Sequence, residues 1–349
     1  MKDFRRHTFS CMDSVVNALI RLNELAVDAI LFIVNEKNEF IGSLTDGDIR
    51  RGFIKGLGIE HNITDFIQSN PHYVYENELN DVDKIISIRE MNIKIIPVLD
   101  KHKHVIDIIN FRITKSFLPI TTVLMAGGRG ERLGSLTSNT PKPMLKLGEK
   151  QIIEYNIESL INNGVKDIYI TVNYLADQLI EHFAMRMSDG VAFTCVKETN
   201  YLGTIGSLGL IKDFNHDTIL VMNSDIFTNI NFEDFYVHFK KSGADISVAS
   251  IPYSISVPYA VLNLNEDKIT GFKEKPSYTF YSNAGIYLIK KEMLDFIPIN
   301  QKFDATDLIQ VAIDAGKNVT FFPIVGYWID IGRPEDYKKA QEFVRYAKP

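Results

Sequence analysis

The chain has 349 residues, which is enough for two or three domains and too long for one small module. Hydrophobic residues make up 45% and charged residues 23%, a composition that indicates a packed core and excludes a disordered or fibrous chain. The formal net charge of -6 argues against broad electrostatic binding to nucleic acid or to an anionic membrane. Any anionic ligand therefore has to be held by a local cluster of basic residues.

The first 118 residues contain an internal repeat. Residues 34–42 (VNEKNEFIG) superpose on residues 98–106 (VLDKHKHVI), and each segment reads as a strand, a charged turn and a strand. Apolar residues at helical spacing precede each hairpin, at residues 15–22 and 79–86. Because each copy is too small to bury a full core alone, we expect the two to pack together as one α+β domain over residues 1–118.

From residue 119 to residue 349, apolar runs alternate with helical patterns. Strands are predicted at TTVLMAGG, DIYITV, VAFTCV and TILVMNSD, with helical stripes between them. This alternation indicates an α/β domain with a Rossmann-like, mostly parallel sheet, and such sheets bind ligands at the carboxyl ends of their strands. Residues 260–276 break the pattern with a hairpin that turns at residues 265–267, which we interpret as an insertion or a lid for a second substrate.

Residues 124–145, LMAGGRGERLGSLTSNTPKPML, carry the strongest functional pattern. Glycines directly after a strand let backbone amides approach a phosphate closely, and arginine and lysine add cationic donors. The segment lacks the GxxxxGK[ST] pattern of a P-loop, and a leucine replaces the third glycine of the dinucleotide fingerprint. We therefore predict a polyphosphate loop of another kind, with its glycines and cations at Gly127, Gly128, Arg129, Gly130, Arg132 and Lys142.

Two aspartates are predicted at the ligand end of the sheet. Asp225 closes the strand TILVMNSD, and Asp330 lies in YWIDIGRP at the end of a later apolar run. Two carboxylates about 4 Å apart repel by about 4 kcal/mol at an effective dielectric of 20, so a cation between them is favoured. Taken singly, either aspartate is as readily a helix cap or a turn residue. Together with the phosphate loop, the pair favours Mg²⁺ that bridges the carboxylates and substrate phosphates.

Residues 120–349 resemble the sugar-phosphate nucleotidyltransferase family, and in particular its mannose-1-phosphate guanylyltransferase-like members, on the motifs GGRGERL, PKPML, NSD, FKEKP, SNAGIY and WIDIG. Such enzymes join a nucleoside triphosphate to a sugar 1-phosphate and release pyrophosphate. The resemblance implies a catalytic set of Arg132, Lys142, Asp225, Lys275 and Asp330, in which the two aspartates hold the metal. It implies sugar-phosphate binding by Glu274, Lys275, Asn283 and Gly285, and nucleotide binding by Ala126, Gly127, Gly128, Arg129, Gly130, Glu198, Gly203 and Thr204.

The reaction needs no protein nucleophile or general base, because the attacking sugar phosphate is already an anion near neutral pH. Its oxygen attacks the α-phosphorus in line, so the site has to bring two polyanions together and offset the charge that develops on pyrophosphate. Cationic side chains and Mg²⁺ supply that compensation.

Glu198 is a candidate for recognising the nucleobase of the nucleoside triphosphate. In KETNYLGTIGSL it precedes the Leu-Gly-Thr segment at a place where uridylyl and thymidylyl relatives carry glutamine. A carboxylate only accepts hydrogen bonds, and guanine offers adjacent N1–H and N2–H donors, whereas uracil N3–H is flanked by acceptors. We therefore predict GTP. The alternative is that Glu198 is a solvated charge at a strand end.

The repeated domain resembles a pair of cystathionine-β-synthase-type (CBS) regulatory repeats, which often bind adenine nucleotides. Thr45 and Asp48 in GSLTDGDIRR match the ribose and phosphate positions of that motif, whereas the second copy carries Ile109 and Arg112 there. Nucleotide sensing and a purely structural role in packing or dimerisation both stay open. We expect a homo-oligomer.

The combination of a repeat pair with a catalytic domain resembles glucosamine-1-phosphate guanylyltransferases of bacterial legionaminic acid synthesis, which implies glucosamine 1-phosphate as the acceptor. Mannose 1-phosphate is the nearest alternative, and a non-catalytic nucleotide sensor is the alternative from another class.

Two distant cysteines, Cys11 and Cys195, form no disulfide framework, and the apolar run at residues 26–34 is too short to span a bilayer. We expect a cytoplasmic protein whose partners include neither nucleic acid nor membrane.

Overall fold

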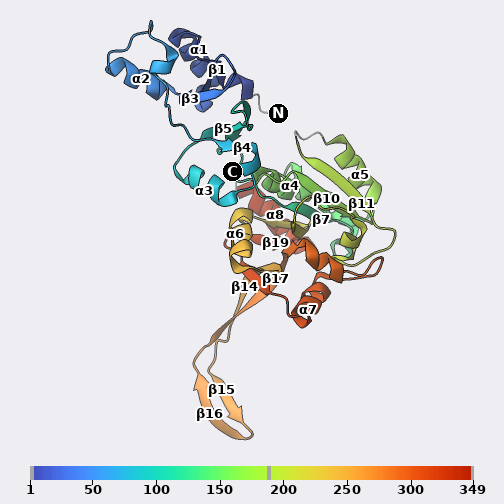
Figure 1. The fold of residues 1–349 in the computed structure, drawn as a ribbon. Helices are drawn as coiled ribbons and strands as arrows, with labels where there is room; N and C mark the ends of the chain where they lie inside the picture. The colour runs from blue at the N-terminus through green and yellow to red at the C-terminus, as the bar shows by residue number, and fades with distance from the viewer. Residues whose placement is uncertain (1–3, 187–189, 347–349) are drawn as a thin grey trace. The chain divides into compact units, whose positions relative to one another are not determined.

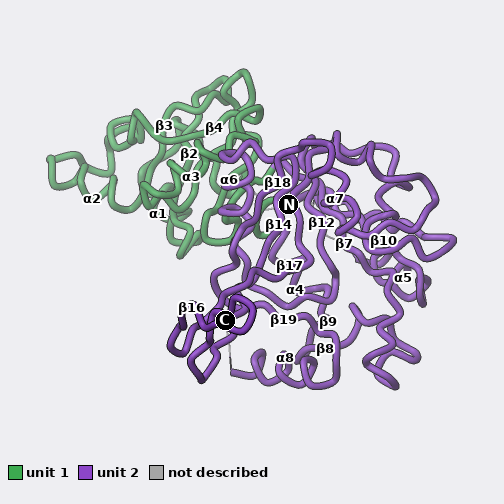
Figure 2. The backbone as a smooth tube through the Cα atoms, turned by 90° about the horizontal axis from the view of Figure 1, so that it is seen from below, with its two compact units in different colours: residues 1–118, 162–164 green, residues 119–161, 165–349 purple. Residues whose placement is uncertain are grey.

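The computed structural model describes residues 4–186 and 190–346 of the chain. The chain divides into two compact units, coloured separately in Figure 2: residues 1–118 with 162–164, and residues 119–161 with 165–349. None of the helices in the described ranges is long and apolar enough to cross a lipid bilayer.

The first unit contains two three-stranded sheets of the same topology. The orders are β1-β2-β3 and β4-β5-β6, and in each sheet the first pair is parallel and the second antiparallel. A helix follows the first strand of each copy, whereas a second helix ends the first copy and a turn with irregular chain, residues 111–118, ends the second. The elements are β1 (Thr8–Ser10), α1 (Val15–Leu25), β2 (Leu31–Val34), β3 (Phe40–Leu44), α2 (Asp46–Ile54), β4 (Val74–Tyr75), α3 (Val82–Glu90), β5 (Ile95–Leu99) and β6 (Val105–Asn110).

One apolar cluster joins the two copies of the repeat. Phe32 and Phe40 of the first copy pack with Ile95, Leu99 and Val105 of the second, and all five are buried. Each copy also has a cluster of its own around its helix. The repeats therefore share a core, as units too small to bury their apolar surface separately must.

The second unit is built on a seven-stranded sheet with the order β11-β10-β7-β12-β17-β14-β18. Neighbouring strands are parallel except at β17, which runs antiparallel to both β12 and β14. Strand β17 is the exception because a hairpin joins it to β14, and a hairpin reverses the chain. The strands are β7 (Thr121–Met125), β10 (Asp167–Val172), β11 (Ala192–Lys197), β12 (Thr218–Asn223), β14 (Ile246–Ser256), β17 (Ser277–Lys290) and β18 (Val319–Pro323).

Helices and short strand pairs complete this unit (Figure 1). The helices are α4 (Ile152–Asn162), α5 (Ala176–Met185), α6 (Phe232–Ser242), α7 (Ala305–Asp314) and α8 (Pro334–Tyr346). The strand pairs are β8 (Lys146–Leu147) with β9 (Lys150–Gln151), β13 (Ile226–Thr228) with β19 (Trp328–Asp330), and β15 (Val261–Asn265) with β16 (Lys268–Lys273).

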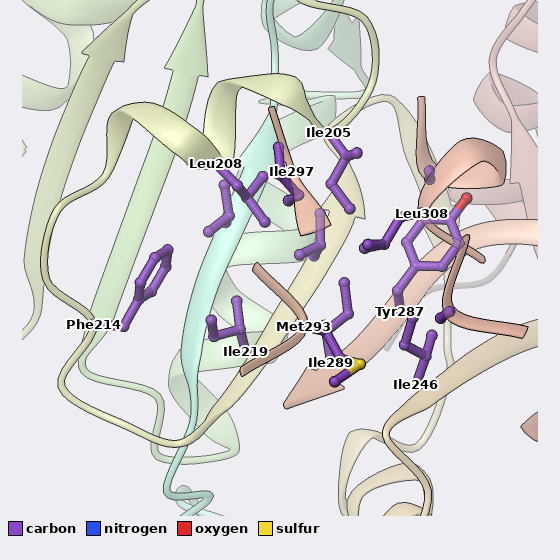
Figure 3. Packing of buried hydrophobic residues seen from close by; sticks show 14 residues of the cluster. Ile205, Leu208, Phe214, Ile219, Ile246, Tyr287, Ile289, Met293, Ile297 and Leu308 are labelled. Carbon is purple, nitrogen blue, oxygen red and sulfur yellow. The ribbon is translucent and has the colours of Figure 1, made fainter. Parts of the chain in front are cut away.

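The core of the second unit anchors the loops that follow its strands. Figure 3 shows Ile205 and Leu208 packed with Ile219 of β12 and Leu308 of α7. Leu208 belongs to a short 3-10 helix, Gly206–Leu210. The residues just before Ile205, which the sequence assigns to nucleotide binding, are thereby held against a rigid core.

Candidate active site

The loop after β7 needs glycine at two positions. Gly130 has φ +65°, in the left-handed region that glycine tolerates, and a Cβ there would lie 3.2 Å from Cβ of Lys142. A Cβ on Gly127 would lie 2.9 Å from Oε1 of Glu198. Thr137 closes the loop by donating its hydroxyl proton to the carbonyl of Gly130 at 3.0 Å. The loop thus packs directly against the lysine and the glutamate that the sequence singles out.

This loop forms one wall of a cavity of about 880 Å³ at the carboxyl ends of β7, β10 and β12. Its other walls come from residues 198–204 and 223–225. The sequence-predicted residues that line it are Ala126, Gly127, Gly128, Arg129, Gly130, Arg132, Lys142, Glu198, Gly203, Thr204 and Asp225. The structure therefore brings the predicted triphosphate and nucleotide residues to one site.

Lys142 and Asp225 meet at one corner of the cavity, and Asp330, which does not itself line the cavity, lies beside them. The buried Lys142 ammonium donates to Oδ2 of Asp225 and lies 3.8 Å from Oδ1 of Asp330. Strand pairing holds the two carboxylates together, because Ile226 of β13 is opposite Asp330 of β19. Burial and the negative charge of Asp225 raise the pKa of Asp330, and Lys142 and Arg132 oppose that rise.

The donor set at this corner fits a divalent cation. Oδ1 of Asp225 is buried and has no hydrogen-bond partner in the described chain, so it is available as an oxygen ligand for a cation. Among the described residues, no three His, Cys, Asp or Glu side chains gather closely enough to hold a metal by themselves. Substrate phosphates would then complete the coordination, as is usual for Mg²⁺ bound through one or two carboxylates.

Glu198 is 5% exposed, so the alternative interpretation of a solvated charge at a strand end is wrong. Its Oε2 accepts the backbone N–H of Leu202 at 3.2 Å, which leaves Oε1 facing Gly127 and the cavity. Burial raises the pKa of the Glu198 carboxyl, and the Leu202 N–H partly offsets this rise. A buried carboxylate at this place can accept hydrogen bonds from a base that offers donors.

The pKa of Glu198 leads to a prediction about stability. Because burial raises that pKa, the ionised carboxylate destabilises the folded chain at neutral pH, and Glu198→Gln is expected to raise the melting temperature there. As the pH falls through the raised pKa, folded wild type takes up its proton and regains this stability, so the difference should shrink. Thermal melts of both proteins from about pH 7 to about pH 4 measure it. A variant that is less stable at neutral pH would contradict the assignment.

The segment with Gly203 and Thr204 is fixed to the start of α7. The backbone N–H of Thr204 donates to Oδ1 of Asp304 at 2.9 Å, and the Thr204 hydroxyl accepts the N–H of Ala305 at 2.8 Å. Gly203 has φ +80°, and a Cβ there would lie 2.7 Å from the same Asp304 oxygen. The sequence analysis missed Asp304; the capping-box spacing DATD at a helix start was the available signal.

Asn223 is a cavity residue that the sequence analysis also missed. It packs on Gly285, where φ is +70° and a Cβ would lie 2.6 Å from Nδ2 of Asn223. Asn283 accepts the N–H of Gly285 at 2.9 Å through its side-chain oxygen. Asn283 and Gly285 therefore lie beside the cavity and brace its wall, although neither lines it. A polar residue at the end of a buried strand was the signal for Asn223.

Glu274 and Lys275 are not brought to the cavity. Both are exposed and lie between β16 and β17, on a hairpin extension of the sheet. In the first unit, Thr45 and Asp48 engage each other in the capping box of α2, and Asp48 also pairs with Arg51. These contacts give Thr45 and Asp48 a structural function at a helix start.

A sheet that presents cations and carboxylates together at its carboxyl end is suited to a nucleotide polyphosphate, which places the chain among nucleotide-binding α/β proteins. The comparison of sequences narrows this class. Residues 121–346 match the Nucleotidyl transferase family, and the chain belongs to that family. The predicted α/β nucleotidyltransferase fold with a mostly parallel sheet is thereby confirmed. Members of this family generally use a divalent metal.

Similar proteins agree with this membership. The chain is 33% identical over 224 residues to mannose-1-phosphate guanyltransferase of Yarrowia lipolytica and 31% identical over 225 residues to that of Schizosaccharomyces pombe. Each match covers 62% of this chain and 61% of the relative, so the chain spans about three fifths of their length. The solved structure of HddC from Yersinia pseudotuberculosis is similar with a TM-score of 0.50 and 26% identity, over 64% of this chain and 98% of HddC.

Proposed function

We propose that this chain transfers a nucleotidyl group from a nucleoside triphosphate to a sugar 1-phosphate and releases pyrophosphate. The observation that carries the proposal is that Lys142 and Asp225 pair in the cavity formed by the glycine loop, with Asp330 3.8 Å from the Lys142 ammonium. The proposal is tested by assaying a matrix of five nucleoside triphosphates against several sugar 1-phosphates in the presence of Mg²⁺. The quantity measured is pyrophosphate release. A flat matrix would favour the alternative, a non-catalytic nucleotide sensor.

The residues of the cavity divide the work of this reaction. Backbone amides of the glycine loop and the side chains of Arg129 and Arg132 hold and orient the triphosphate. Lys142, fixed by Asp225, places a positive charge where the triphosphate meets the carboxylates. Asp225 and Asp330 would hold Mg²⁺, which supplies charge compensation for the pyrophosphate that leaves. No side chain has to form a covalent intermediate, since the sugar phosphate is itself the nucleophile.

The proposed nucleotide is GTP, and Glu198 is the proposed base-reading residue. Its burial and fixed Oε2 leave Oε1 toward the cavity as an acceptor for guanine N–H groups. Glu198→Gln keeps the volume but replaces one acceptor by a donor. Because a mispaired buried polar group costs about 1–3 kcal/mol, we expect the preference for GTP over UTP in kcat/KM to fall by about tenfold to a hundredfold.

The control for this variant is Glu158→Gln, which alters a partly exposed glutamate of α4 that pairs with Lys150 of β9, outside the cavity. The control should keep the wild-type nucleotide profile. An unchanged profile in Glu198→Gln would remove Glu198 from base recognition.

For the acceptor we propose glucosamine 1-phosphate, with mannose 1-phosphate as the alternative that the names of the relatives favour. The nucleotide sugar would then serve the synthesis of a surface glycan or of a nonulosonic acid such as legionaminic acid. The same matrix of substrates separates the two acceptors through their kcat/KM values.

For the first unit we propose a CBS repeat pair that binds an adenine nucleotide, and its duplicated β-α-β-β topology supports this. Titration of AMP onto the full chain, with the catalytic cavity saturated by GTP, should still release heat. No heat at millimolar AMP would leave the unit a structural role in packing or dimerisation.

A further inference from the structure

The second unit carries a long hairpin arm, residues 251–282, that continues the sheet through β14 and β17 and ends in β15 and β16 (Figure 1). An unbroken antiparallel ladder pairs β14 with β17 from Ser250 and Asn283 out to Ser256 and Ser277. The structure describes every residue of the arm, and none of them is buried. The arm has no apolar core of its own.

The stem of the arm has one apolar face. Tyr253 is opposite Phe280 and Ile255 is opposite Tyr278, so these four side chains share a side of the ladder. They are 58%, 55%, 46% and 37% exposed in that order. The other side carries Ser254, which bonds to Thr279 across the strands at 3.0 Å. Such alternation is typical of strands with one face buried against another layer.

The tip repeats this pattern. Leu262 is opposite Phe272 and Leu264 is opposite Ile269, and all four are at least half exposed. A two-stranded ribbon is marginally stable in water by itself, and contiguous exposed apolar surface marks a contact site. The arm therefore needs a protein surface to cover it.

Glu274 and Lys275, which lie on the arm, do not line the cavity of their own chain. None of the described residues that line it comes from residues 251–282. Its lysine, Lys142, is already paired with Asp225, whereas a sugar phosphate brings a second polyanion that needs a cation. Glu274 and Lys275, which the sequence assigns to the sugar phosphate, are exposed on the arm.

Distance along the ladder separates these residues from the cavity of their own chain. Strand β17 passes the cavity near Asn283, because Gly285 packs on the cavity residue Asn223. Lys275 lies eight residues farther out, which at about 3.3 Å per residue is roughly 25 Å. Folding the arm back would break the backbone pairs of the ladder. A second copy of the chain has the same open cavity and the same uncovered arm.

We propose that two copies of this chain exchange arms, so that Glu274 and Lys275 of one copy complete the sugar-phosphate side of the other copy's cavity. The catalytic part of this inference rests on the proposed nucleotidyl transfer. A two-fold exchange satisfies both needs together, since each cavity gains a cation and each apolar face gains cover. On the opposite face of the ladder, the Tyr281 ring contacts the ring of Phe321 on the edge strand β18, with 4.9 Å between the centroids, so the base of the arm is tied to the body and the face with Tyr253 and Phe280 stays uncovered.

A cross-linking experiment tests the exchange without reference to activity. The test protein combines Lys275→Cys with Tyr201→Cys, because Tyr201 lines the cavity and its side chain is exposed. Its two natural cysteines, Cys11 and Cys195, are changed to serine. With a short bismaleimide, exchanged arms give a covalent dimer. An internal link at the mass of one chain would show that the arm closes on its own cavity, and the absence of any link would show that the arm stays away; both results overturn the proposal.

Complementation tests the shared site. Arg132→Ala and Lys275→Ala are each expected to lose at least nine tenths of the activity, and heterodimers purified through two different tags should recover about half of the wild-type rate. One of their two cavities then has both residues intact. Heterodimers as inactive as their parents, or a fully active Lys275→Ala, would refute the proposal. Failure of the proposed function would appear differently, as an inactive wild type, and the cross-link would still decide the exchange.

The apolar face has a matched test. Tyr253→Ser combined with Phe280→Ser should turn the dimer into a monomer by light scattering and lower kcat/KM for the sugar 1-phosphate. Ser254→Ala combined with Thr279→Ala alters the opposite face of the same ladder and should leave the dimer intact. A Tyr253 and Phe280 variant that remains a dimer would refute the role of this face.

Discussion

Replacing Asp225 by asparagine is expected to lower kcat by at least about a thousandfold, the order of effect seen when a preorganised electrostatic group is removed from an active site. Asparagine keeps the volume of the side chain but removes the charge from the buried Oδ1, the atom that has no partner in the described chain. The Lys142 ammonium retains Asp330 at 3.8 Å, so the fold should persist. Pyrophosphate release at saturating Mg²⁺ and substrates measures the loss.

The control residue lies next to the opposite end of β12, the strand that Asp225 follows. Asp217 precedes β12 and is exposed, so Asp217→Asn should keep wild-type turnover. Circular dichroism melts of both variants separate loss of chemistry from loss of fold. Full activity in Asp225→Asn would mean that the catalytic carboxylates are misassigned.

The same variant has a consequence for pH. The negative charge of Asp225 helps to raise the pKa of Asp330, so removing that charge should lower this pKa. Asp330 has to be ionised to hold a cation. The acid side of the residual rate profile of Asp225→Asn should therefore move to lower pH than in wild type.

The sequence is informative about this site where local rules apply. A glycine turn after an apolar run predicts a phosphate loop, and the rule that strand ends share one edge predicts that Asp225 and Asp330 lie close together. The structure has both beside the Lys142 ammonium although 105 residues separate them in the chain, from 225 to 330. Topology, rather than spacing along the chain, makes that inference possible.

Features that depend on distant packing were beyond these rules. The sequence predicts Glu198 as a base-reading residue but leaves a solvated charge as the alternative, because charged residues are usually exposed; its burial follows from Leu202 and the glycine loop, which enclose it. The antiparallel course of β17 follows from its hairpin to β14, which strand and helix alternation does not show. The hairpin predicted at residues 260–276 is the tip of a longer arm, because strand pairing continues on both sides of it.

Replacing Lys142 by methionine is expected to have the second large effect, on stability as well as on rate. Lys142 is 7% exposed and lies between the carboxylates of Asp225 and Asp330. Without it two like charges face each other, and breaking a buried pair costs about 3–5 kcal/mol; because the partners are partly exposed, we expect a loss of about 2 kcal/mol in the free energy of unfolding. Urea unfolding in the absence of divalent ions measures it.

Mg²⁺ should restore more stability to Lys142→Met than to wild type, because the two carboxylates then bind the cation without competition from the ammonium. The rate of nucleotidyl transfer by Lys142→Met should not recover with Mg²⁺, since the triphosphate has lost its contact with the Lys142 ammonium. The matched control is Lys150→Met, which removes an exposed lysine from its surface pair with Glu158 and should cost less than about 1 kcal/mol with no response to Mg²⁺. Equal stability of Lys142→Met and wild type in metal-free urea would show that the lysine does not hold the two aspartates together.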